Sequence, residues 1–253
     1  MINLSIIIPF LNSHELVRRQ IINLKNMDLP EDVEIIYMDD GSNPPLKMPI
    51  DPPKNFQIYA TNDFRPWTSS LARNTGATIA RGSYLFMTDG DYIITKKAVM
   101  IALGFCGDRL GCRREFGILD EDGNFTQDHN VLMSYGLPEW RIKERGTKIP
   151  PHPNNFIMRA SLFKEMGGYR EDLILSRPYP QGEDRHFKRL LMKLVNEGKI
   201  VINDYKRPTI YMFPNGQFCG DVDYNPFNLF HTLTRKTPQN HWYLNPRYIR
   251  GEK

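Results

Sequence analysis

Apolar residues in the first third of the chain fall into short runs that alternate with stretches of helical period. Residues 4–10 (LSIIIPF) are a run of β-branched and other apolar side chains, which is typical of a strand buried on both faces. Ser13 then offers a helix cap, and Val17, Ile21 and Leu24 follow at helical spacing. The pattern predicts a buried strand followed by an amphipathic helix.

The same alternation continues to about residue 91. Residues 33–42 (VEIIYMDDGS) predict a second strand running into a turn, and residues 56–60 predict a third. Residues 68–80 have the character of a helix, and residues 83–91 (SYLFMTDGD) predict a fourth strand that ends in acids. This order favours an α/β fold with a mostly parallel, Rossmann-like sheet and helices on both faces.

The second half is less regular. Residues 120–123 (DEDG) form a good hairpin turn between two short strands, and residues 155–158 predict another strand. Apolar positions between residues 187 and 195 predict an amphipathic helix. After about Gly216 the sequence is aromatic, polar and basic with little periodicity, so we expect an irregular tail or lid rather than a domain.

Composition narrows the class of protein. The chain of 253 residues suits one large α/β domain or two small ones, and its net charge of +4 permits an acidic partner without requiring one. Three cysteines without CxxC spacing (Cys106, Cys112 and Cys219) predict free thiols, as in a cytoplasmic protein. We expect no transmembrane segment, because no apolar run is long enough, and no signal peptide, because residues 1–10 lack a basic leader.

Four acids lie at the carboxyl ends of predicted strands: Asp39, Asp40, Asp89 and Asp91. Open α/β sheets bind ligands at that edge. Asp89 and Asp91, separated only by Gly90, could share a ribose and a hard divalent cation, which would neutralise a departing diphosphate. The alternative is a plain acidic turn.

Other side chains have two interpretations each. Asp39 or Asp40 could accept the imino N–H of a uracil, or could form an Asx-type turn. Arg73 could orient the carboxylates or bind a phosphate, or could form a surface salt bridge. Glu183 and Asp184 begin a predicted helix, where the helix dipole favours acidic side chains. One of them could instead take a proton from a hydroxyl. A lone His231 is either structural or a ligand.

Five segments in one order carry a family resemblance. They are LSIIIPFLN, IIYMDDGS, LARNTGATIARGSYLFMTDGD, NNFIMRASLFKEMGGYRED and GEDRHFKRL. Together they resemble the family 2 glycosyltransferases of the GT-A fold over about residues 3–195, with a looser match in residues 96–150. The GGYRED and GED segments, followed by HTLTRK from His231, are also similar to β-1,4-galactosyltransferases and related polymerases.

The resemblance implies a division of the chain. Residues 1–215 would form the GT-A domain, with a nucleotide-binding half (1–95) and an acceptor-binding half (96–215), and residues 216–253 would form the C-terminal tail or lid.

It also implies roles for individual residues. The nucleotide pocket would include Pro9, Asp39 or Asp40, and Arg73, while Asp89 would face the ribose and the metal. Asp91 would bind Mn²⁺ or Mg²⁺, with His231 as a third protein ligand. Asp184 in the Glu183–Asp184 pair would be the general base. Two departures are that residues 65–67 (RPW) replace the family's glycine-rich loop and that a long interval separates Asp184 from His231.

The expected function is an inverting transfer of sugar from a UDP-sugar donor to an acceptor hydroxyl, with a saccharide or glycan as acceptor. A DNA-modifying enzyme acting on a hydroxylated base and a non-catalytic nucleotide-sugar-binding module are the alternatives. A nucleotidyltransferase is disfavoured, because residues 10–13 (FLNS) replace the Gly-rich, basic phosphate loop of such enzymes. The sequence leaves the donor sugar and the oligomeric state open.

Overall fold

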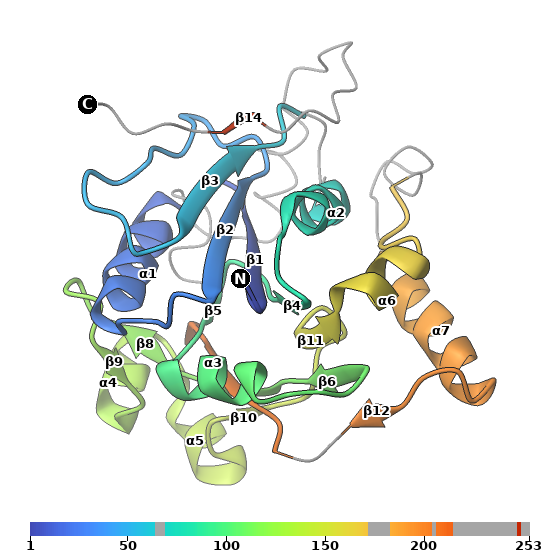
Figure 1. The fold of residues 1–253 in the computed structure, drawn as a ribbon. Helices are drawn as coiled ribbons and strands as arrows, with labels where there is room; N and C mark the ends of the chain where they lie inside the picture. Colours follow the sequence, from blue (N-terminus) through green and yellow to red (C-terminus); the bar gives the residue numbers. More distant parts are fainter. Residues whose placement is uncertain (64–68, 172–182, 204–205, 215–246, 249–253) are drawn as a thin grey trace.

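An eight-stranded sheet forms the centre of the molecule (Figure 1). The computed structural model describes residues 1–63, 69–171, 183–203, 206–214 and 247–248. The sheet has the order β12-β6-β11-β4-β1-β2-β3-β14. Its strands are β1 (Leu4–Phe10), β2 (Val33–Asp39), β3 (Phe56–Ala60), β4 (Tyr84–Met87), β6 (Arg109–Gly111), β11 (Phe156–Arg159), β12 (Ile202–Asn203) and β14 (Arg247–Tyr248).

The strands that end in acids run parallel to one another. Strand β1 pairs in parallel with both β2 and β4, and β2 pairs in parallel with β3. Strand β11 is antiparallel to β4 and to β6. The predicted α/β fold with a mostly parallel sheet is confirmed, and the parallel strands bring the acidic segments after β2 and β4 to one edge.

Helices cover both faces of the sheet, as predicted. Helix α1 (His14–Asn26) lies on one side of the parallel strands and α2 (Ser69–Ile79) on the other (Figure 1). Side chains alternate between the faces of a strand, so Ile6 joins the cluster that contains α1 and α3 (Lys96–Leu103), while Ile7 joins the cluster that contains α2. The second cluster also includes α6 (Ala160–Glu165) and α7 (Glu183–Asn196).

A second, four-stranded sheet supports the segment after β4. Its order is β10 (Lys148–Ile149), β7 (Arg113–Phe116), β13 (Thr209–Met212) and β5 (Tyr92–Ile93). Strand β5 follows Asp91 directly and pairs antiparallel with β13. The chain immediately after the acidic turn is therefore fixed by a sheet.

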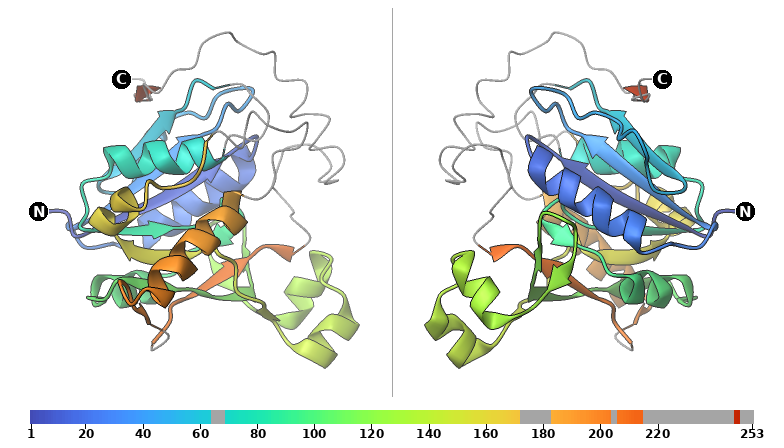
Figure 2. Two further views of the ribbon diagram at one scale, coloured as in Figure 1. Left: turned by 90° about the vertical axis from the view of Figure 1, so that its right-hand side faces the viewer. Right: turned by 90° about the vertical axis from the view of Figure 1, so that its left-hand side faces the viewer.

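The predicted hairpin around residues 120–123 is present but short. Strands β8 (Ile118–Leu119) and β9 (Phe125–Thr126) form it, whereas the preceding β7 pairs with β10 and β13. Helices α4 (His129–Ser134) and α5 (Glu139–Arg145) follow, and Figure 2 shows them together at one end of the molecule, away from β3.

Of the predicted C-terminal tail, the structure describes only residues 247–248 beyond residue 214. These form β14, which pairs antiparallel with β3 and so adds a strand to the sheet. In the described part of the chain, no helix combines the length and the apolar character that crossing a membrane requires. Cys106 and Cys112 are free thiols, and Cys219 lies outside the described residues.

Candidate active site

The Asp89–Gly90–Asp91 turn lies against the end of β1. Strand β4 pairs with β1 through Ile7 and Met87, so the turn that follows reaches the end of that neighbouring strand. A Cβ atom on Gly90 would lie 2.7 Å from Cδ1 of Phe10 and 2.9 Å from the carbonyl oxygen of Pro9. Gly90 is therefore required by its contact with β1, and Pro9 lies beside the acidic turn, while its place in a nucleotide pocket stays a prediction.

A buried glutamine of α1 binds the backbone of this turn. Nε2 of Gln20 donates to the carbonyl oxygens of Gly90, at 2.7 Å, and Tyr92, at 3.1 Å. Its Oε1 accepts a hydrogen bond of 3.1 Å from the hydroxyl of Tyr37 in β2. Gln20 thus fixes the carbonyl groups on both sides of Asp91.

Arg73 of α2 forms an ion pair with Asp89. The guanidinium is buried, and its Nη2 donates to Oδ1 of Asp89. Its Nε and Nη1 atoms are buried and have no hydrogen-bond partner in the described part of the chain. Arg73 is therefore paired with an acid of the turn from a buried position and not from the surface, and its role in orienting the carboxylates or binding a phosphate stays a prediction.

The neighbouring Asn74 holds the segment around Gly168. Its Nδ2 donates to the carbonyl oxygen of Tyr169 at 2.8 Å, and its Oδ1 accepts from the Tyr169 amide at 2.9 Å. Gly168 has φ +64°, and a Cβ there would lie 2.5 Å from Oδ1 of Asn74. The Tyr169 ring in turn packs 5.4 Å below the guanidinium of Arg73. Two of the sequence motifs are thus one packed unit beside Asp89.

His152 lies between the acidic turn and the start of α7. Its Nδ1 is 3.7 Å from Oδ2 of Asp89, and its Nε2 is 3.9 Å from Oδ2 of Asp184. Burial lowers the pKa of His152, and Arg114 adds to this, although Asp89 and Asp184 oppose it. The structure therefore brings Asp89 and Asp184 to either side of one imidazole.

The start of α7 contributes two carboxylates. Oδ1 of Asp184 accepts a hydrogen bond of 2.7 Å from the amide of Arg185, while Oδ2 faces His152. The charge of Glu183 acts on the pKa of Arg73, so this acid also lies near the Arg73–Asp89 pair. The predicted catalytic pair is in the same site as the predicted metal-binding acids.

The carboxyl group of Asp91 has a raised pKa. Burial, and then the neighbouring Asp89 carboxylate, raise the pKa of Asp91 to about 7. Two carboxylates in one turn repel each other, and a divalent cation between them would relieve that repulsion. Hard oxygen ligands of this kind suit Mg²⁺ or Mn²⁺. The described residues alone hold no cluster of three or more His, Cys, Asp or Glu side chains suited to a metal.

The two acids at the end of β2 have different surroundings. Oδ1 of Asp39 accepts from the Ser42 amide at 2.8 Å, and Oδ2 accepts from the Leu46 amide at 2.9 Å. This is the turn-forming role expected as an alternative. Asp40 is also buried, and its amide donates to the carbonyl oxygen of Phe10 at 2.8 Å, which places it beside the end of β1.

Several expectations lie outside the described residues. These include His231 and residues 65–67. In the other direction, His152 and Gln20 are site residues that the sequence analysis missed. Gln20 was detectable, because it occupies the apolar face of α1 beside Leu16, Val17, Ile21 and Leu24, where a polar side chain needs a buried partner. His152 carries no such signal, because it lies between two prolines without periodicity.

Solved structures share the fold. The chain of TarS residues 1–349 from S. aureus matches with a TM-score of 0.52 and 18% identity over 84% of this chain and 60% of that chain. The same protein in complex with UDP-GlcNAc matches with a TM-score of 0.53 and 19% identity, covering 92% of this chain and 64% of that one. This chain therefore spans less than two thirds of the length of TarS 1–349.

Comparisons of sequence identify the family. No curated protein matches the chain. The model of "Glycosyl transferase family 2" matches residues 5–167, which is more than half of the chain and includes Asp39, Asp40, Arg73, Asp89 and Asp91. With the GT-A-like arrangement of the sheet and the acids at its carboxyl edge, this match shows that the chain belongs to glycosyl transferase family 2.

Proposed function

We propose that the protein is an inverting glycosyltransferase that uses a divalent metal to transfer a sugar from a UDP-sugar to an acceptor hydroxyl. The observation that carries this proposal is the position of His152, which is within 4 Å of both Asp89 and Asp184. Asp89, which is proposed for the donor, and Asp184, which is proposed as the base, therefore lie on either side of one imidazole ring. A transfer reaction needs those two functions in one site.

A uridine nucleotide is the proposed donor carrier. Asp39 already uses both carboxylate oxygens within the turn, so Asp40 is the acid of this pair that we assign to the uracil imino group. Structures of TarS include complexes with UDP and with UDP-GlcNAc, which supports a uridine donor for a protein of the same fold. Pro9 and Arg73 would line the same pocket.

Asp89 and Asp91 are the proposed holders of Mn²⁺ or Mg²⁺, and His231 is proposed as a third ligand. A bound divalent ion would supply positive charge to the departing diphosphate. The Arg73 pair holds Asp89 in place, and Gln20 holds the backbone around Asp91. These residues would keep the two carboxylates oriented whether or not the ion is bound.

Asp184 is the proposed general base. The acceptor oxygen attacks the anomeric carbon from the face opposite the diphosphate, and its proton passes to the Asp184 carboxylate. One displacement of this kind inverts the configuration at the anomeric carbon. Glu183 would bind a second hydroxyl of the acceptor. The N-terminal end of a helix favours negative charge, so the start of α7 is a suitable position for these acids.

The acceptor is proposed to be a saccharide or glycan. No described feature corresponds to a nucleic-acid-binding motif, so a hydroxylated DNA base is not favoured. A non-catalytic module is not favoured either, because one acid of DGD, Asp89, and one acid of GED, Asp184, face the same imidazole ring.

The proposal is tested by incubating the protein with a panel of nucleotide-sugars, with Mn²⁺ or with EDTA, and measuring free nucleotide. Release of UDP from a UDP-sugar only in the presence of the ion supports it. Nucleotide release unaffected by EDTA would remove the metal from the proposal. Absence of release from every donor, with UDP binding intact, would instead favour the binding module.

A further inference from the structure

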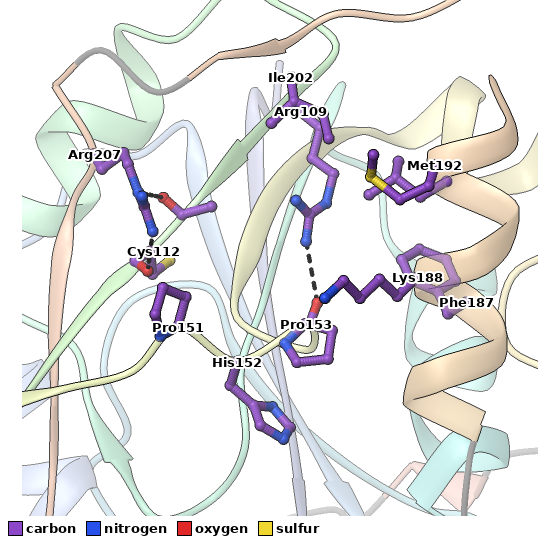
Figure 3. Close-up of a pocket in the computed structure, with 12 residues that line it drawn as sticks. Arg109, Cys112, Pro151, His152, Pro153, Phe187, Lys188, Met192, Ile202 and Arg207 are labelled. Carbon is purple, nitrogen blue, oxygen red and sulfur yellow. Dashed lines mark hydrogen bonds between the residues drawn. The ribbon is translucent and has the colours of Figure 1, made fainter. Parts of the chain in front are cut away.

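A cavity of about 180 Å³ opens beside His152 (Figure 3). Its walls are β6, the loop 151–153 and α7, together with a segment after β12. Figure 3 shows the His152 ring directed away from Arg109 and Arg207. The same ring reaches Asp184 and Asp89 on its other side. One loop residue therefore separates the cavity from the proposed catalytic acids.

Cationic side chains from three separate elements line this cavity: Arg109, Lys188 and Arg207. Arg109 is buried, donates to the carbonyl oxygen of Pro153 at 3.1 Å, and lies 4.9 Å above the Phe156 ring. Figure 3 shows Lys188 extending from α7 toward Pro153. Both side chains therefore approach the same wall.

Arg207 completes the group from the opposite wall. It donates to the carbonyl oxygens of Gly111, at 3.2 Å, and Cys112, at 3.1 Å. None of the described residues that line the cavity is acidic, and the remaining surface includes Leu191, Met192 and Ile202. Apolar walls lower the local dielectric and strengthen the attraction of these cations for an anion.

We propose that this cavity binds an anionic group, a phosphate or a carboxylate, carried by the acceptor. The inference rests on the proposed function, since it gives the acceptor a position relative to Asp184. A neutral saccharide would gain little from three cations that line one cavity, whereas a phosphate group can accept hydrogen bonds from guanidinium and ammonium groups. An acceptor anchored here would pass around His152 to present its hydroxyl to Asp184.

The test uses inorganic phosphate as probe on the protein saturated with UDP and Mg²⁺, so that the donor site is already occupied. The melting temperature is followed against phosphate concentration at constant ionic strength, which yields a dissociation constant. Lys188→Gln should weaken phosphate binding about threefold to fivefold, because it removes one exposed charge. Arg207→Gln, from a partly buried site, should weaken it about tenfold.

Lys193→Gln is the matched control. Lys193 is also an exposed lysine of α7, but it lies near Glu197 and does not line the cavity. It should leave phosphate binding unchanged. Arg207→Gln also removes hydrogen bonds to two backbone carbonyl groups and could prevent folding. In that case the comparison of Lys188→Gln with the wild type decides the test. Equal phosphate binding in wild type, Lys188→Gln and Lys193→Gln, or no binding in wild type, would overturn the proposal.

A second arm separates an acceptor-borne phosphate from a free ion. Glycerol 3-phosphate should stabilise the UDP-bound protein at least as well as phosphate, and glycerol should not stabilise it. Stabilisation by phosphate but not by glycerol 3-phosphate would overturn the acceptor role. The proposed function is tested by other measurements, namely stabilisation by UDP itself and release of UDP from a donor. Its failure can therefore be distinguished from failure of the anion site.

Discussion

The side-chain amide of Gln20 donates a hydrogen bond of 2.7 Å to the carbonyl oxygen of Gly90, which joins the middle of α1 to the acidic turn. A second bond from the same nitrogen reaches Tyr92, so the backbone is held on both sides of Asp91. Because Gln20 is buried and touches only backbone there, it acts on the carboxylates through the turn. It is a positioning residue for the proposed metal site.

Gln20→Met should therefore weaken activation by metal. Methionine fills a similar volume but cannot donate to either carbonyl oxygen. We expect the metal concentration for half-maximal activity to rise about tenfold, as is typical when a group behind a metal ligand is lost.

The control for this prediction is Asn23→Leu, one turn further along α1. Asn23 donates to the carbonyl oxygen of Ile94, beyond the strand that follows the acids. Its loss should lower the melting temperature without changing metal activation. If both variants change only the melting temperature, Gln20 is a structural residue alone.

Asp91→Asn should abolish metal-supported transfer and preserve the fold. Burial, and then the neighbouring Asp89 carboxylate, raise the pKa of Asp91 to about 7, so its negative charge is unfavourable when no cation is present. We expect a loss of at least about 100-fold in UDP release with Mn²⁺ and an equal or higher melting temperature. Asp122→Asn, in the exposed hairpin turn, is the control and should retain activity. Full activity of Asp91→Asn would remove Asp91 from the metal site.

UDP should stabilise the protein more than GDP or ADP at equal concentration. We assign the uracil to Asp40, and an acid that accepts the imino N–H of uracil discriminates between bases. We expect the thermal shift of the wild type to be larger with UDP than with GDP or ADP. In Asp40→Asn the shift with UDP should fall to the level of the other two nucleotides. Equal shifts for all three nucleotides in the wild type would remove the reason for assigning a uridine donor.

The sequence predicts those site residues whose position follows from the local pattern of strands and turns. It does not predict residues whose position depends on tertiary packing. Asp89 and Asp91 were located because an apolar run ending in acids defines a strand and its carboxyl edge. The roles of Asp39 and Asp40 could not be separated, because the two acids are adjacent at the end of β2 and only the folded turn shows that Asp39 binds the Ser42 and Leu46 amides.

Pairings between distant segments were the second limit. No sequence pattern indicates that Asn74 binds Tyr169. Nor does any pattern indicate that β7 pairs with β10 and β13, which leaves only the short strand β8 for the hairpin. His152 reaches the site through a proline-flanked loop whose course depends on β11 and on Arg114, which donates to the carbonyl oxygen of Pro150 at 2.6 Å. Such positions follow from the fold and not from local propensity.

His152→Phe should lower turnover with little change in UDP affinity. The imidazole lies between Asp89 and Asp184, and phenylalanine keeps the ring but removes both nitrogen atoms. We expect turnover to fall about tenfold or more, because neither carboxylate would retain this neighbour for its orientation. His129→Phe, on an exposed position of α4, is the control and should be neutral. Unchanged turnover in His152→Phe would show that His152 only fills space.

Asp184→Asn separates a catalytic base from a helix cap. Attack on the anomeric carbon requires the acceptor oxygen to lose its proton, and a positioned base typically contributes about 10²–10⁴-fold to the rate. Asparagine is itself a good residue at a helix start, so a purely structural Asp184 predicts near-normal activity and an unchanged melting temperature. As a base, Asp184 predicts a loss of at least about 100-fold in turnover. UDP affinity should stay the same, because Asp184 faces His152 and is proposed to act on the acceptor rather than on the nucleotide. Measuring the transfer rate and the UDP dissociation constant of this one variant decides between the two roles: retained turnover leaves the cap, and lost turnover with intact UDP binding leaves the base.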